Sequence, residues 1–166
     1  EDTLKGFYFK ITDIWKRLCE QHKNLYESTL DEYKILLSGE IDELDNVLIH
    51  KNKIIEEISN LEHLRQQNIV EINDTLENNS ISSVHDLIIF IKKYESDMNS
   101  NYFIKFNQLL IDLIENITQQ NKINQLFINK AILSLDKIKN YSCKDNHFKT
   151  YDRKGSTSKS SLNINR

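Results

Sequence analysis

The chain has 166 residues and a formal net charge of −3, with three Gly and no Pro. Its apolar runs all stay well short of the roughly 20 residues that a bilayer-crossing helix needs, and a β-rich or α/β fold would need more turn residues than these. With 28% charged and 39% hydrophobic residues, the composition indicates narrow apolar stripes on long helices, and not a thick globular core.

The first two predicted helices are separated by a very short connection. Apolar residues recur at three- and four-residue steps over residues 4–37, and Ser38-Gly39 ends this helix because Gly readily adopts the left-handed conformation after a helix. A second helix is predicted for residues 40–73. Helices joined by so short a loop run antiparallel, so residues 4–73 are expected to form a helical hairpin.

Two further helices follow. Ser83 and Asp86 resemble a capping box at the start of a short helix over residues 84–95. The last predicted helix, residues 102–140, carries the most regular heptad spacing, which is typical of a left-handed coiled coil. We call this set of positions the apolar seam: Phe103, Phe106, Leu110, Leu113, Ile117, Gln120, Asn124, Phe127, Ala131, Ser134 and Ile138.

The last part of the chain differs in composition. Residues 141–166 carry six basic and two acidic residues, a net charge of +4, which leaves −7 for the remainder. The basic residues are scattered and lack interleaved aromatic residues, so a solvated tail is favoured over a nucleic-acid site. The sequence thus predicts an all-α protein, an elongated antiparallel hairpin or coiled-coil bundle over residues 1–140, with a flexible, disordered basic tail over residues 141–166.

Residues suited to catalysis or metal binding do not form a recognisable pattern. A zinc site needs about four converging ligands, and only Cys143 and His147 are suitably spaced. The sequence also lacks a glycine-rich phosphate loop, and its histidines are scattered. We therefore expect neither an enzyme nor a metal or cofactor site. The two isolated cysteines are typical of reduced thiols, which favours a cytoplasmic location without stable membrane insertion.

Two polar features leave alternatives open. Gln120 and Asn124 interrupt the apolar seam, with Asn121 beside them. They either form a buried amide layer that fixes helix register or offer donors and acceptors to a client helix. In the tail, Tyr151 begins the segment Tyr151-Asp152-Arg153-Lys154-Gly155, which is either a short docking motif or an isolated aromatic residue in a polar stretch.

Several stretches, in order, resemble the FlgN family of flagellar type III export chaperones. Leu36-Leu37-Ser38-Gly39-Glu40-Ile41-Asp42 is similar to the turn between that family's first two helices. Lys53-Ile54-Ile55 and Leu61-Glu62-His63-Leu64-Arg65 resemble its second helix. Asn121-Lys122-Ile123-Asn124 and the tail segment with Tyr151 and Gly155 resemble its N-x-x-N and tail motifs.

The resemblance implies two binding sites. The last helix would bind the C-terminal helical region of hook–filament junction proteins and prevent their premature assembly. Tyr151, Asp152 and Gly155 in the tail would dock on the cytoplasmic domain of the export gate protein. The cargo-binding residues implied in this way are Phe106, Leu110, Leu113, Ile117, Gln120, Asn121, Asn124, Phe127 and Ile128.

A different class of function also fits the helical pattern. A structural coiled-coil scaffold or adaptor would assemble permanently with itself, whereas a chaperone would stay a monomer or a weak homodimer until its client binds. Neither alternative involves nucleic acid. Self-association therefore separates the two hypotheses.

Overall fold

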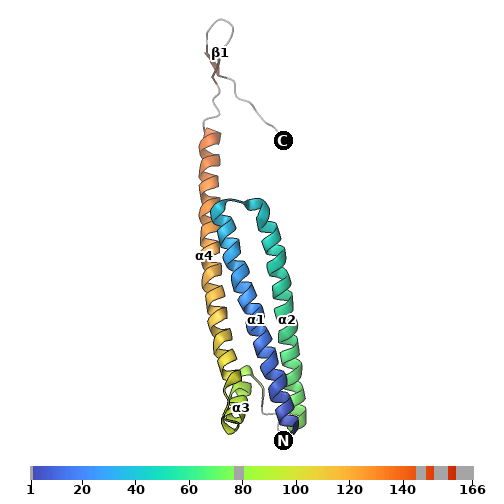
Figure 1. Ribbon diagram of the computed structural model, residues 1–166. Helices are drawn as coiled ribbons and strands as arrows, with labels where there is room; N and C mark the ends of the chain where they lie inside the picture. Colours follow the sequence, from blue (N-terminus) through green and yellow to red (C-terminus); the bar gives the residue numbers. More distant parts are fainter. Residues whose placement is uncertain (1, 77–80, 145–148, 152–156, 160–166) are drawn as a thin grey trace. The chain divides into compact units, whose positions relative to one another are not determined.

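The computed structural model describes residues 2–76, 81–144, 149–151 and 157–159 (Figure 1). Its four helices are α1 (Asp2–Ser38), α2 (Ile41–Leu76), α3 (Val84–Asp97) and α4 (Tyr102–Lys144). By contacts the chain divides into two units, Glu1–Asn124 and Gln125–Arg166, and each is described by itself. The all-α fold class predicted from the sequence is confirmed.

The hairpin turns at the predicted position. Gly39 has a φ of +76°, and its N–H donates to the carbonyl oxygen of Ile35 at 3.0 Å. This left-handed conformation is the one that Gly adopts most readily at the end of a helix. The return of the chain brings Lys10 near the start of α1 within 3.4 Å of Glu71 near the end of α2, so α1 and α2 are antiparallel.

The core of the first unit draws on all four helices. Trp15 of α1 packs on Phe103 of α4, with ring centroids 4.7 Å apart. Burial of such aromatic and aliphatic side chains is the main driving force for packing long amphipathic helices together. The core residues with the least exposed side chains are Ile11, Trp15, Leu18, Leu61, Ile72, Ile81, Leu87, Ile91 and Phe103.

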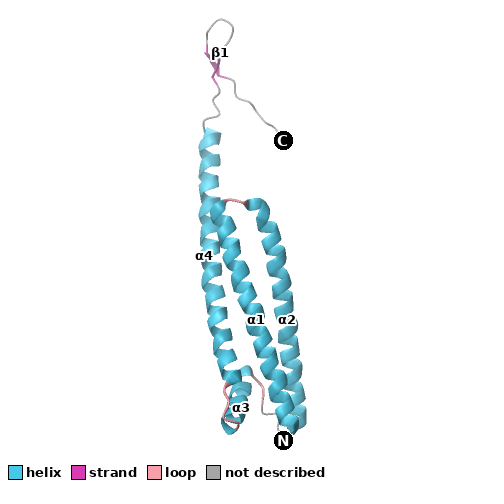
Figure 2. Cartoon of the chain, viewed as in Figure 1, coloured by secondary structure: helices cyan, strands magenta, loops and turns pink. Residues whose placement is uncertain are grey.

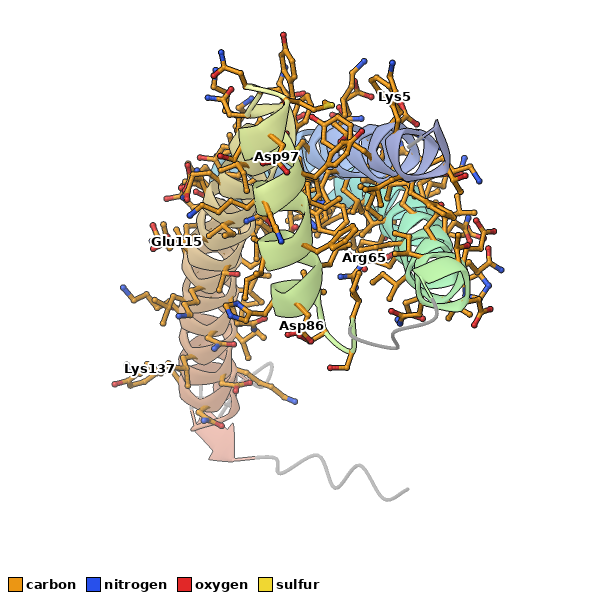
Figure 3. All side chains as sticks on the ribbon, turned by 90° about the horizontal axis from the view of Figure 1, so that it is seen from below. Lys5, Arg65, Asp86, Asp97, Glu115 and Lys137 are labelled. Atoms are coloured by element: carbon orange, nitrogen blue, oxygen red, sulfur yellow. The ribbon has the colours of Figure 1, made fainter. Side chains whose placement is uncertain are left out.

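Helix α3 begins with the predicted capping box. The Ser83 hydroxyl accepts from the Asp86 N–H at 3.1 Å, and the Asp86 carboxylate accepts from the Ser83 N–H at 3.0 Å. These bonds satisfy N–H groups that a helix start leaves without intrahelical partners. Figure 3 shows α3 from Asp86 to Asp97, with the Asp97 end toward α1.

Buried Glu95 joins the end of α3 to α1 and α4. Its carboxylate accepts from the Tyr8 hydroxyl at 2.7 Å and from the N–H groups of Phe103 and Ile104 at 2.6 and 3.3 Å. A carboxylate is stabilised at a helix N-terminus by the exposed N–H groups and the helix dipole. Burial and, to a lesser extent, Glu95 raise the pKa of the Tyr8 hydroxyl, so it remains a donor.

The second unit contains the rest of α4 and two short strands, β1 (Lys149–Tyr151) and β2 (Thr157–Lys159), drawn as magenta arrows in Figure 2. The strands pair antiparallel with Thr150 opposite Ser158. Thr and Tyr, which occur among these six residues, favour such extended pairing. The division into residues 1–140 and 141–166 stays a prediction.

Candidate functional site

Side chains from α1 hold the first half of α4. The indole N–H of Trp15 donates to Asn107 Oδ1 at 3.1 Å, and Cys19 Sγ donates to the Phe106 carbonyl oxygen at 3.2 Å. Trp15 also packs on Phe103, and further along both helices Thr29 contacts Asn124. Because residue numbers rise together from the first of these two contacts to the second, α1 and α4 run parallel. The first half of the apolar seam therefore packs inside this chain.

A buried amide continues this contact toward the end of the first unit. Asn124 is 2% exposed. Its Nδ2 donates to the Thr29 carbonyl oxygen at 3.0 Å, and its Oδ1 accepts from Gln120 Nε2 at 2.9 Å. Of the two alternatives left open by the sequence, this geometry is that of a buried amide layer at Asn124, while Gln120 is only half-buried.

An ion pair between Lys51 of α2 and Glu32 of α1 lies next to this amide layer. Lys51 Nζ lies 2.6 Å from Glu32 Oε2 and donates to Asn121 Oδ1 at 3.1 Å. The Lys51 and Glu32 side chains are 14% and 10% exposed. Burial makes such a pair costly to break, since one partner alone would be left as an unpaired charge. The layer thus connects α1, α2 and α4.

The predicted cargo residues lie in three kinds of environment. Leu110, Ile117 and Asn124 are buried in this chain's own core. Asn121 is exposed and accepts from Lys51. The half-buried members are Phe106, Leu113, Gln120, Phe127 and Ile128.

Phe106 and Leu113 border a shallow apolar groove between α1 and α4, about 210 Å³ in volume. Buried Cys19 forms part of its floor, and Leu109 contributes a further apolar side chain. Burial, with a smaller contribution from Glu20, raises the pKa of the Cys19 thiol to about 11. The thiol is therefore protonated near neutral pH and is a poor nucleophile.

The second half of α4 presents a row of apolar side chains, of which Leu135 was not among the residues predicted from the sequence. Leu135 and Ile138 are 65% and 62% exposed. With half-buried Ile128 and exposed Ala131 they repeat at three- and four-residue steps, and we call these four residues the C-terminal stripe. A row of exposed apolar residues at this spacing is a common docking face for a partner helix.

Heptad counting could have found Leu135, the one member of the C-terminal stripe that was not predicted. Ile128 and Leu135 each lie four residues after a position of the apolar seam, Asn124 and Ala131. Such positions flank the seam of a coiled coil and are usually polar. Isoleucine and leucine there widen the apolar face of α4, which was the signal available from the sequence alone.

The predicted tail residues are described only in part. Tyr151 ends β1 and its backbone lies opposite Thr157 of β2. Asp152 and Gly155 lie outside the described residues. The export-gate contact at these three positions therefore stays a prediction.

Other site chemistries can be assessed only for the described ranges. Among those residues, three or more His, Cys, Asp or Glu side chains nowhere converge as metal ligands. The helices within the same ranges are each too polar or too short in their apolar stretches to cross a membrane. The pKa of the Asp86 carboxyl is lowered first by the Ser83 hydroxyl and then by Ser82. This shift is therefore explained by the capping box at the start of α3 and does not indicate a catalytic site.

Long helices that pack through apolar and amide contacts and bear an exposed apolar stripe define an all-α protein suited to binding other helices. The family model described as FlgN protein matches residues 8–159, and the chain belongs to the FlgN family. In general terms this makes it a flagellar type III export chaperone that binds export substrates, in a family not known for enzymatic activity. Comparisons with curated proteins and with solved structures returned no match.

The second-helix segment that resembles the family has a structural role. Leu61 is 2% exposed in the core. The Arg65 guanidinium lies 5.8 Å from the centroid of the Trp15 ring and pairs with Glu62. A cation over an indole face stabilises their contact, so this segment orients the tryptophan that α4 packs against.

Proposed function

We propose that this protein is a cytoplasmic chaperone for flagellar hook–filament junction proteins. It binds their C-terminal helical region, prevents premature assembly, and delivers them to the cytoplasmic domain of the export gate protein. Membership of the FlgN family supports the class of function. The observation that carries the binding mode is the C-terminal stripe, an exposed apolar row on a helix whose first half already packs by the same heptad.

The client helix binds along the second half of α4. Leu110, Ile117 and Asn124 are buried within this chain, and Asn124 contacts Thr29 of α1. The C-terminal stripe therefore supplies the cargo contacts that a client meets first, with Phe127 directly before it in the sequence. Burying a Leu or Ile side chain contributes about 1.5–3 kcal/mol. Because a few such anchors dominate an interface, Leu135 and Ile138 join the cargo residues.

The tail makes the second contact. Tyr151, Asp152 and Gly155 dock on the export gate protein, with Tyr151 as the aromatic anchor. The segment carries both charges and an aromatic residue in a short polar stretch, a composition suited to specific docking with modest affinity. Cargo binding and gate docking then involve different parts of the chain and can be separated by mutation.

Capture of the client tests the first contact. The chain is purified from the native cytoplasm and the bound protein is identified by mass spectrometry. Leu135→Asp combined with Ile138→Asp should weaken client binding more than tenfold, since about 1.4 kcal/mol corresponds to a factor of ten. Leu133→Asp is the matched control, because Leu133 is 61% exposed on the same helix but lies outside the C-terminal stripe. Equal loss in both variants would contradict the assignment.

Truncation tests the second contact. Removal of residues 145–166 leaves α4 intact to Lys144, so it should preserve client binding while abolishing export. Tyr151→Ala should weaken binding to the purified cytoplasmic domain of the gate protein. If truncation reduced client binding as much as export, the two contacts would not be separate.

Sedimentation at increasing concentration distinguishes this function from a self-assembling scaffold. A chaperone should remain a monomer or a weak homodimer and form a defined complex with its client. Strong self-association without a client would favour the scaffold.

A further inference from the structure

A row of lysines follows one side of the second half of α4. Lys130 and Lys137 are exposed and lie seven residues apart, and Lys144 repeats the spacing once more in the sequence. Figure 3 labels Lys137 on α4. Asp136 is the only acidic residue in the sequence of residues 125–144, which also contains Lys139. This part of α4 is therefore basic, whereas the chain as a whole has a net charge of −3.

The lysine row lies at the edge of the C-terminal stripe. Lys130 directly precedes Ala131, and Lys137 directly precedes Ile138. In the heptad repeat these lysines occupy positions that flank the apolar face. Charged side chains at such positions determine which partner binds and in which orientation. The opposite flank carries Ile128 and Leu135, which are uncharged. Only one edge of the stripe can therefore select a partner by charge.

We infer that the client helix is acidic along the edge that faces Lys130 and Lys137. It would carry Asp or Glu at seven-residue spacing beside an apolar heptad. This inference rests on the proposed function, because it specifies the chemistry of the client at the same surface. Complementary charge of this kind raises association rates and excludes wrong partners more than it adds affinity.

A second copy of this chain fits the surface poorly. An antiparallel copy would place the two lysine rows against each other, and like charges opposed in this way are unfavourable. A parallel copy would place the lysines opposite Ile128 and Leu135, which offer them no carboxylate. The charge pattern thus selects a different chain as partner.

A membrane surface also fits less well. A helix that lies on anionic lipid confines its apolar residues to one side and its basic residues to the other. On α4, exposed Leu126 and Leu133 lie away from the C-terminal stripe, so apolar side chains are distributed around the helix. Lys130 and Lys137 line one edge of the C-terminal stripe, as expected for helix pairing, whereas Lys139 follows Ile138 and lies outside that row.

Two synthetic three-heptad peptides provide the probe. Both have Leu at the seam positions, and the flanking positions are all Glu in one and all Lys in the other. Like charges keep each peptide from pairing with itself. With the full-length chain at low salt, the association rate constant of the Glu peptide should exceed that of the Lys peptide by on the order of tenfold. The difference should shrink in 1 M salt, where the screening length is about 3 Å.

Charge reversal identifies the residues responsible. Lys130→Glu combined with Lys137→Glu should invert the preference, so that the Lys peptide binds faster. Lys92→Glu combined with Lys93→Glu is the control, because both lysines are exposed on α3, and the Glu peptide should remain preferred. An unchanged preference in the Lys130/Lys137 variant would overturn the inference.

The remaining outcomes separate this inference from the proposed function. Equal binding of both peptides, lost in Leu135→Asp, would overturn the charge selection while leaving the docking face in place. Binding of neither peptide would also overturn the inference, and the proposed function would still be judged by capture of the native client. Strong self-association lost in Leu135→Asp, or binding to phosphatidylglycerol vesicles lost in the Lys130/Lys137 variant, would replace the acidic client by a second copy or a membrane.

Discussion

Asn124 donates from Nδ2 to the main-chain carbonyl oxygen of Thr29 at 3.0 Å, joining α4 to α1 through a side chain that is 2% exposed. Since one amide can reach this carbonyl in only one alignment of the helices, the bond fixes their register. Buried Asn in coiled coils has the same effect, at some cost in stability. The first half of α4 therefore packs against α1 of the same chain and is not available to a client.

Substitutions at Asn124 should show whether its hydrogen bond serves mainly to align the helices or also adds to the free energy of unfolding. Asn124→Leu should leave the free energy of unfolding in urea within about 1 kcal/mol of the wild-type value or raise it, because an apolar side chain suits this buried position. Asn124→Asp should lower it by about 3 kcal/mol, since a carboxylate would face the Thr29 carbonyl oxygen without a donor. Similar losses in both variants would argue against a bond that serves mainly for register.

The Lys51–Glu32 pair should behave as a unit. Lys51→Met or Glu32→Leu alone should each destabilise the protein by about 3–5 kcal/mol, because the remaining charge is left in a site that is 10–14% exposed. The double variant should recover most of that loss. Urea unfolding of all four proteins gives the coupling energy, and additive losses would show that the charges act independently.

Glu95 and Tyr8 form another coupled pair. Tyr8→Phe should lower the free energy of unfolding by about 1.5–3 kcal/mol, the usual range for a hydrogen bond to a charged group. Glu95→Ala should cost at least as much, because the Phe103 and Ile104 N–H groups also lose their acceptor. Tyr102→Phe is the control, since Tyr102 is 64% exposed, and its effect should stay within about 0.5 kcal/mol.

The capping box of α3 should make stability depend on pH in the acid range. The hydroxyls of Ser83 and Ser82 hold the pKa of Asp86 below its ordinary value of 3.8. Because the folded-state pKa is lowered, Asp86 stabilises the fold fully above pH 3.8 and loses this effect as the pH falls through its folded-state pKa. The stability difference between wild type and Asp86→Asn, followed by circular dichroism, should therefore vanish in strong acid. Ser83→Ala should reduce this pH dependence.

Local signals predicted much of the fold. Gly39 at the hairpin turn and Ser83 with Asp86 at the start of α3 act through neighbouring residues, so their positions could be found in the sequence. The predicted helix over residues 84–95 ended short of Asp97 because residues 96–101 lack the apolar pattern. Glu95, inside that helix, gave no local sign of being buried. Its carboxylate is buried by contacts with Phe103 of the next helix and with Tyr8, which lies 87 residues away in the sequence, and neither contact has a local signature.

The candidate site was predicted in outline. The heptad from Phe103 identified the helix face that packs, but periodicity does not distinguish a face covered by the same chain from one left for a partner. Contacts between helices, such as those of Trp15 with Phe103 and of Thr29 with Asn124, show that the first half is covered. The C-terminal stripe is the part of this face on which apolar residues are exposed, at Ala131, Leu135 and Ile138.

The buried thiol of Cys19 provides a way to measure how often α4 separates from α1. Its Sγ donates to the Phe106 carbonyl oxygen, and its pKa of about 11 keeps it protonated near neutral pH. Because Cys19 is 4% exposed, a thiol reagent too bulky to enter the groove should modify it chiefly when α4 separates from α1. In a Cys143→Ser background, the rate of modification therefore measures how often that separation occurs. Comparing this rate with and without the client would show whether loading loosens or tightens the fold.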